Sequence, residues 1–208
     1  MRDLSISVHF VRSVLKNAVA QGLDPVGLLR KNRISPRLLL EDNARVSIER
    51  FADLQVNTML AMQDEALGYA TRRMPLGCWS MMCHAVIGCE TLGQALSRFC
   101  RFYQLFEFGI QPHLEESPEA AIIRLQQVED DSEPDPYLSE LVLFNVHRFA
   151  SWLVKEHLPL QVVELGYPPA AQPTDYRHMF LGNPVEFDQE HTRMQLAPSL
   201  LDKRVNQS

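Results

Sequence analysis

A change of hydrophobic period near residue 106 constrains the fold of this chain more than any other feature. Apolar residues recur at helical spacing over 92–106, and they then alternate singly over 106–110 and again over 121–125. Residues three or four apart line one face of a helix, whereas single alternation lines one face of a strand. We therefore expect an amphipathic helix followed by a pair of strands joined by a turn at 115–118.

Helix signals dominate the sequence before this change. A helical pattern over 4–21 ends at Gly22, and Asp24-Pro25, Ser35-Pro36 and Ser47 each provide the start of another helix. Helices are also predicted over 78–88 and 137–157, and short strands over 160–167, 185–187 and 192–197. The order predicts an α+β fold in which a helix-rich N-terminal part packs on a small, mainly antiparallel sheet. We expect a single domain over 1–208.

Charge and composition narrow the classes of function. The net charge of −6 gives little basic surface, which disfavours DNA binding by this chain alone. The chain shows no apolar run of membrane-spanning length and no secretory signal. The cysteines, which all lie within 78–100, are expected to be reduced thiols in a cytoplasmic protein.

The sequence offers no catalytic or metal-binding motif that we can identify. It has no nucleophile elbow, phosphate-binding loop or dinucleotide-binding glycine pattern. Cys78, Cys83, His84 and Cys89 are the candidate metal ligands, but on one helix the three cysteines point in divergent directions. We predict no enzyme, no catalytic residue, no metal and no cofactor, and keep a thiol or metal sensor as an alternative function.

Asn145 is the most informative single residue. It lies at the centre of the apolar side of the predicted helix over 137–157, where a buried amide requires a hydrogen-bond partner. That partner is either a backbone group or a ligand in an otherwise apolar pocket. Trp79, Tyr103 and Trp152 are candidate aromatic walls of such a pocket, although each also suits a plain hydrophobic core.

Arg148 is a second candidate, because with His147 and Lys155 it forms a small basic face on the same predicted helix. Such a face is either a solvated surface or a site that captures the carboxylate of a ligand through the planar guanidinium. The candidate ligand-binding residues are therefore Trp79, Tyr103, Asn145, Arg148 and Trp152.

Four segments of the chain carry a resemblance to a known family. They are 20–34, the sequence QDEALG at 63–68, CETLGQAL at 89–96 with Arg101-Phe102-Tyr103, and FLGNPVEF at 180–187 running on to Asp202. Together they resemble the N-terminal regulatory domain of AraC-type transcriptional regulators, in the class of ornithine-utilisation regulators. The sugar-binding domain of the arabinose regulator itself is a cupin-like barrel, so the helix-rich pattern here does not imply sugar binding.

The resemblance implies sensing of a small-molecule effector and self-association, most simply as a homodimer. In this family, a separate C-terminal unit with two helix-turn-helix motifs binds DNA, and we expect this chain to be the regulatory half without that unit. The acidic charge agrees with this expectation. The alternative is an interaction module that dimerises without any ligand.

Overall fold

The computed structural model describes residues 5–106, 108–127 and 135–206. Its N-terminal part is rich in helices, as the sequence predicts, and it also contains a two-stranded antiparallel ribbon formed by β1 and β2. The elements of this part are β1 (Ser5–Ser7), α1 (Val8–Ala20), α2 (Pro25–Lys31), the 3-10 helix η1 (Pro36–Leu40), β2 (Arg45–Ser47) and α3 (Ile48–Met62).

Polar side chains cap these helices close to the predicted starts. The Asp24 carboxylate accepts hydrogen bonds from the N–H groups of Val26 and Gly27 at the start of α2. The Ser47 hydroxyl accepts one from the N–H of Arg50 in α3. Each cap satisfies N–H groups that have no partner within the helix, and this fixes where the helix begins.

The remaining elements build a five-stranded sheet with helices around it. The strand order is β3-β4-β7-β5-β6, in which only the β5–β6 pair is parallel. The α+β class with a mainly antiparallel sheet is therefore confirmed. The elements are α4 (Cys78–Ile87), α5 (Leu92–Phe106), β3 (Ile110–Glu116), β4 (Ala121–Gln127), α6 (Pro136–Val154), β5 (Val162–Glu164), α7 (Pro173–Met179), β6 (Val185–Glu186), β7 (Arg193–Leu196) and the 3-10 helix η2 (Pro198–Asp202).

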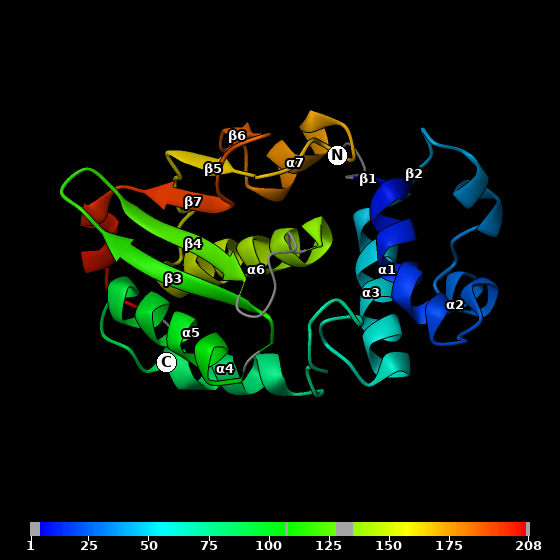
Figure 1. Ribbon diagram of the computed structural model, residues 1–208, viewed down its shortest axis with the longest axis horizontal. Coiled ribbons are helices and arrows are strands. Elements are labelled where there is room, and N and C mark those ends of the chain that lie inside the picture. Colours follow the sequence, from blue (N-terminus) through cyan, green and yellow to red (C-terminus); the bar gives the residue numbers. More distant parts are fainter. Residues whose placement is uncertain (1–4, 107, 128–134, 207–208) are drawn as a thin grey trace.

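Figure 1 shows two groups of elements, with α1–α3 at one end and the sheet with α4 and α5 at the other. Helix α6 runs behind the sheet and reaches toward the N-terminal helices (Figure 1). Buried apolar residues of both groups, such as Phe10, Phe99 and Tyr176, belong to one continuous core. Residues of α6 line cavities on the side of both groups.

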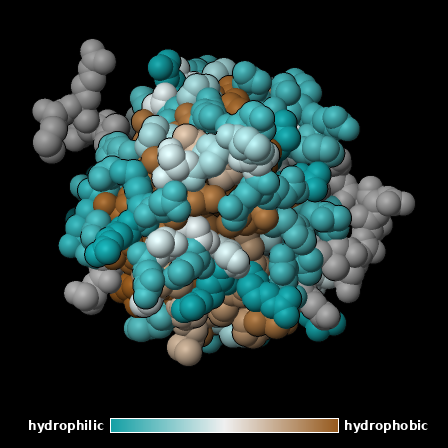
Figure 2. Space-filling view, turned by 90° about the vertical axis from the view of Figure 1, so that its left-hand side faces the viewer, coloured by the Kyte–Doolittle hydropathy of each residue, from teal (hydrophilic) through white to brown (hydrophobic). Residues whose placement is uncertain are grey.

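The end of the molecule that carries the turn between β3 and β4 is mostly hydrophilic, with hydrophobic side chains in smaller areas between polar ones (Figure 2). Isolated apolar side chains are normal on a soluble surface. This face therefore offers no broad hydrophobic patch.

The predicted end of one strand needs correction. The first strand of the pair was expected to end before Pro112, but β3 continues through it to Glu116. The reason is that β3 is an edge strand, where a proline without an N–H can be tolerated. The strand pair itself and its turn are confirmed.

The polar residues of the long helix are more buried than the sequence indicates. A solvated basic face was one interpretation of His147, but His147 is buried, as are Glu140 and Ser151 on the same side of the helix. The chain after α6 folds back over them, where the carbonyl of Leu158 hydrogen-bonds His147 Nε2 and the N–H of Leu158 donates to Ser151 Oγ. Trp152, a candidate for a pocket wall or the core, is instead 49% exposed.

Candidate ligand-binding site

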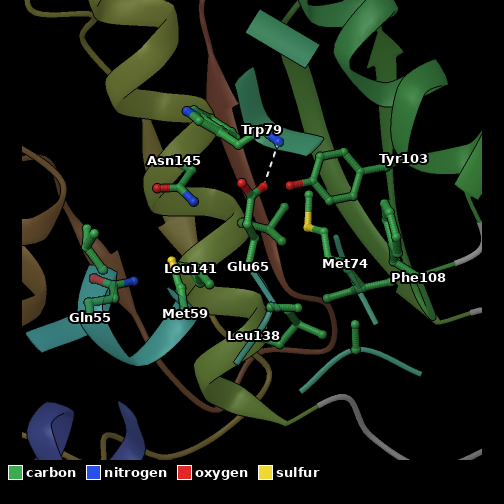
Figure 3. Close-up of a pocket in the computed structure, with 15 residues that line it drawn as sticks. Gln55, Met59, Glu65, Met74, Trp79, Tyr103, Phe108, Leu138, Leu141 and Asn145 are labelled. Atoms are coloured by element: carbon green, nitrogen blue, oxygen red, sulfur yellow. Dashed lines mark hydrogen bonds between the residues drawn. The ribbon is translucent and has the colours of Figure 1, made fainter. Parts of the chain in front are cut away.

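A cavity of about 280 Å³ lies where α3, α4, α5 and α6 approach one another. The segment between α3 and α4 and the start of β3 complete its walls. Most of its lining is apolar, as shown in Figure 3, and includes Met59, Met74, Phe108, Ile110, Leu138 and Leu141. Cavities of this kind, with a few polar groups among apolar walls, are typical small-molecule sites.

Three of the predicted site residues come together in this first cavity. Trp79 from α4, Tyr103 from α5 and Asn145 from α6 all line it, although they are far apart in the sequence (Figure 3). Among the residues that the structure describes, no hydrogen bond to the Asn145 side chain is formed. The backbone partner considered from the sequence is therefore absent there, and the amide is left facing the cavity.

Glu65 is a polar wall residue that the sequence analysis did not identify. Its two carboxylate oxygens accept hydrogen bonds from the N–H groups of Gly77 and Trp79, each at 2.7 Å. These N–H groups lie at the start of α4, where the helix dipole favours a negative charge. Figure 3 shows the Tyr103 hydroxyl pointing toward the same carboxylate. Each oxygen accepts one of these two bonds and retains capacity for a ligand donor.

Asp64 explains how Glu65 is positioned. Its buried carboxylate accepts hydrogen bonds from the N–H groups of Ala66, Gly68 and Met74, so it closes the loop that leads from α3 toward α4. A short helix was expected in this segment, but the residues after Asp64 form turns instead. The loop presents both Glu65 and Met74 to the cavity.

Gly109 allows this loop to approach the sheet. Its φ of +92° is in the left-handed region, and a Cβ there would lie 1.9 Å from the Thr71 hydroxyl oxygen. The N–H of Thr71 donates to the carbonyl of Phe108 at 3.1 Å. Only glycine permits this close contact without movement of the backbone, and the contact fixes Phe108 in the cavity wall.

Tyr103 contributes a neutral hydroxyl. Burial, with nearby negative charges including Glu65, raises the pKa of its phenol far above the ordinary value. The phenol therefore stays protonated at neutral pH and can both donate and accept a hydrogen bond.

Arg148 lies at a second cavity, of about 370 Å³, between the N-terminal helices, α6 and α7. Its Nε donates to the carbonyl of Met179 and its Nη2 to that of His178, each at 3.2 Å. The basic face expected from the sequence is not formed, because His147 is fully buried while Lys155 is exposed at the end of α6.

Trp152 lines neither of these two cavities. Its ring stacks on Phe149 with the centroids 5.6 Å apart, and Phe149 in turn meets the edge of Trp79 at 5.6 Å. Trp152 therefore supports the wall of the first cavity from outside, through Phe149. The two cavities are neighbours, since Gln55 and Leu141 line both.

The cysteines give little support to a thiol or metal sensor. Burial raises the pKa of the Cys78 and Cys83 thiols to about 11, which disfavours the reactive thiolate. Within the described residues, no group of three or more His, Cys, Asp or Glu side chains is placed to bind a metal ion.

Comparison with known proteins now gives the family. The model of the arabinose-binding domain of AraC transcription regulators, an N-terminal domain, matches residues 22–205. The chain belongs to this family. The resemblance predicted from the four sequence segments is thereby confirmed at the level of the family, which consists of regulatory domains of transcription factors.

A solved structure is similar to this chain, but only distantly. The crystal structure of transcriptional regulator CdpR from Pseudomonas aeruginosa aligns with 95% of this AraC-type domain at 18% identity and a TM-score of 0.45. The alignment covers 57% of the CdpR chain, so the domain spans little more than half of that regulator. A search of curated protein sequences gives no match. In the described part of the chain, no helix is both long and apolar enough to cross a bilayer.

Proposed function

We propose that this domain binds a small-molecule effector in the first cavity and that occupancy controls a DNA-binding unit attached to it in the intact regulator. One observation carries the proposal: the Asn145 amide faces an apolar cavity and has no hydrogen-bond partner among the described residues. The amide is only half-buried, so water can hydrogen-bond to it in the empty cavity, and a ligand group that reproduces those bonds can replace that water. Family membership supplies the regulatory context.

The lining indicates what kind of molecule fits. Asn145 offers one acceptor and two donors, Glu65 offers acceptors, and Tyr103 offers a hydroxyl. The other walls are apolar, so the effector is expected to have an apolar body and at least one group that hydrogen-bonds to these residues. A volume of about 280 Å³ restricts it to a small metabolite.

The position of the cavity suggests how binding is transmitted. Its walls come from α3 in the N-terminal group and from α4, α5 and α6 in the sheet group. A ligand shifts a conformational equilibrium only if it binds two states with different affinity. An effector that contacts both groups would favour the arrangement in which they are closed on it.

Self-association is the other part of the proposal. Met81, Leu105 and Phe106 are 66%, 62% and 48% exposed on α4 and α5. Large apolar side chains exposed on adjacent helices favour a protein–protein contact, and a second copy of the domain is the partner that the family resemblance implies.

A thermal-shift screen of amino acids, amines and fatty acids tests effector binding. A ligand that binds only the native state raises its melting temperature. We expect a specific compound to do so, and Asn145→Leu to abolish the response while Asn43→Leu, on the exposed surface, retains it. A screen without any response, together with a stable dimer, would favour the ligand-free interaction module instead.

A further inference from the structure

The second cavity has walls that differ from those of the first. It is lined by β1, α1, α3, α6 and α7, and its volume of about 370 Å³ is large enough for a small organic molecule. Aromatic rings from three helices face it, together with aliphatic side chains. These wall residues are Phe10, Ile48, Phe51, Phe144 and Met179.

Glu140 is the unusual residue of this cavity. It lines the cavity, only 2% of it is exposed, and its Oε1 has no hydrogen-bond partner among the described residues. The hydroxyl of Tyr176 hydrogen-bonds the same carboxyl group, so the group is only partly satisfied. A buried carboxyl oxygen without a partner is rare and costly, which calls for a physical reason.

The neighbouring charged groups do not supply that partner. Asp175 also lines the cavity, but it is paired with Arg45, whose Nη2 lies 2.5 Å from its Oδ1. Arg148 donates to the carbonyls of His178 and Met179, and its guanidinium lies 5.3 Å from the centre of the Phe144 ring. Glu140 lines this cavity and a neighbouring pocket beside α1, and because its Oε1 is buried, a molecule in the cavity reaches this oxygen only when the side chain turns toward it.

Carboxylate oxygens and aromatic ring faces share a preference for positive charge. An ammonium group is attracted to the faces of aromatic rings and donates strong hydrogen bonds to carboxylates. An anion would be repelled by Glu140, and a purely apolar molecule would leave Oε1 unsatisfied. We propose that the second cavity binds an organic ammonium ion with an apolar body, whose ammonium group donates a hydrogen bond to Glu140.

The ionisation of Glu140 is compatible with this ligand. Burial raises the pKa of its carboxyl to about 7, so a substantial fraction is ionised at neutral pH. This site is separate from the proposed effector site, although the two cavities meet at Gln55 and Leu141. Its existence does not depend on ligand binding beside Asn145.

Calorimetric titration of the whole chain with three matched probes tests the proposal. The probes are 4-phenylbutylammonium, the neutral 4-phenylbutan-1-ol and the anionic 4-phenylbutyrate. We expect the ammonium probe to bind at one site, at least about tenfold more tightly than the other two, because only it forms a charge-assisted bond with the carboxyl. No binding of the ammonium probe, or equal binding of all three, would overturn the proposal without reference to any variant.

Two substitutions locate the probe. Glu140→Gln keeps the shape of the side chain and should weaken ammonium binding by at least about tenfold, since it removes the charge. Glu119→Gln, on the exposed turn before β4, should leave the affinity unchanged. A thermal melt of each variant verifies folding.

A different pattern would place the probe elsewhere. If Glu65→Gln abolished ammonium binding while Glu140→Gln retained it, the ammonium ion would occupy the first cavity, and a second site would be disproved. That result would leave effector binding beside Asn145 intact, so the two proposals fail independently.

Discussion

Helix α6 forms a wall of both cavities, but the polar wall residues of the two cavities differ in how much their burial reduces the stability of the fold. In the first, the half-buried Asn145 amide is neutral, and Glu65 has backbone N–H partners. In the second, Glu140 is almost fully buried and one of its oxygens lacks a partner. An amide loses only hydrogen bonds when it is buried, whereas a carboxyl also loses favourable solvation of its charge. Substitution of these polar groups should therefore change stability little in the first cavity and substantially in the second.

The largest expected difference concerns the apolar walls. Phe10 is 1% exposed and packs edge-on against Phe51 and Tyr176, so Phe10→Ala should destabilise the domain by about 3–5 kcal/mol. Trp79→Ala removes a half-buried ring of the first cavity and should cost clearly less. Urea unfolding of both variants measures the difference. Equal losses would show that the walls of both cavities are equally part of the core.

The second prediction concerns pH and Glu140. Its pKa is raised from 4.5 to about 7, so between these pH values the unfolded chain releases a proton that the folded chain retains. Stability from this group therefore falls as the pH rises through that interval, by about 3 kcal/mol in total. At about pH 8, Glu140→Gln should be more stable than the unaltered protein by roughly that amount.

Near pH 4.5, the lower end of this interval, the two proteins should differ little, because both carry a neutral side chain there. The measurement is the free energy of unfolding of both proteins across this range. A constant difference at all pH values would contradict the raised pKa. A stabilising substitution that also removes ammonium binding would show that the carboxyl is retained for binding rather than for stability.

The comparison of the cavities also shows what the sequence can predict. The change of period near residue 106 depends on neighbouring residues only, and it correctly predicted α5 and the β3–β4 pair. A helical wheel similarly placed Asn145 on the side of α6 that faces the first cavity. Local patterns therefore identified three residues that line the first cavity but not the buried carboxyl in the second.

The wheel failed on the other side of α6 for a physical reason. A helical wheel compares residues within one helix only. It contains no information on later segments of the chain, whose carbonyls at Leu158, His178 and Met179 hydrogen-bond to His147 and Arg148. The burial of Glu140 therefore could not be predicted from the helix alone. Glu65 was missed because its partners are 12 and 14 residues away, across a loop whose conformation is fixed by hydrogen bonds to Asp64.

Glu65 provides the third prediction. Glu65→Ala removes the carboxylate that accepts the N–H groups of Gly77 and Trp79, so it should destabilise the domain by about 1 kcal/mol, as loss of a helix cap does. Glu119→Ala is the matched control on an exposed turn. The midpoint of urea unfolding measures both. If the two variants lost equal stability, the carboxylate would not act as a cap for α4.

The smallest expected effect is at Asn145 itself. Without a ligand, its amide forms no hydrogen bond with the described residues, so Asn145→Leu breaks none of them and adds apolar contact with Leu138 and Leu141 in the cavity wall. The free energy of unfolding should change by less than about 1 kcal/mol, since the half-buried amide forms no bond with the protein that the substitution would break. Effector binding, in contrast, should be lost. A large loss of stability in the ligand-free variant would mean that the amide supports the fold, and it would remove the main argument for Asn145 as a binding residue.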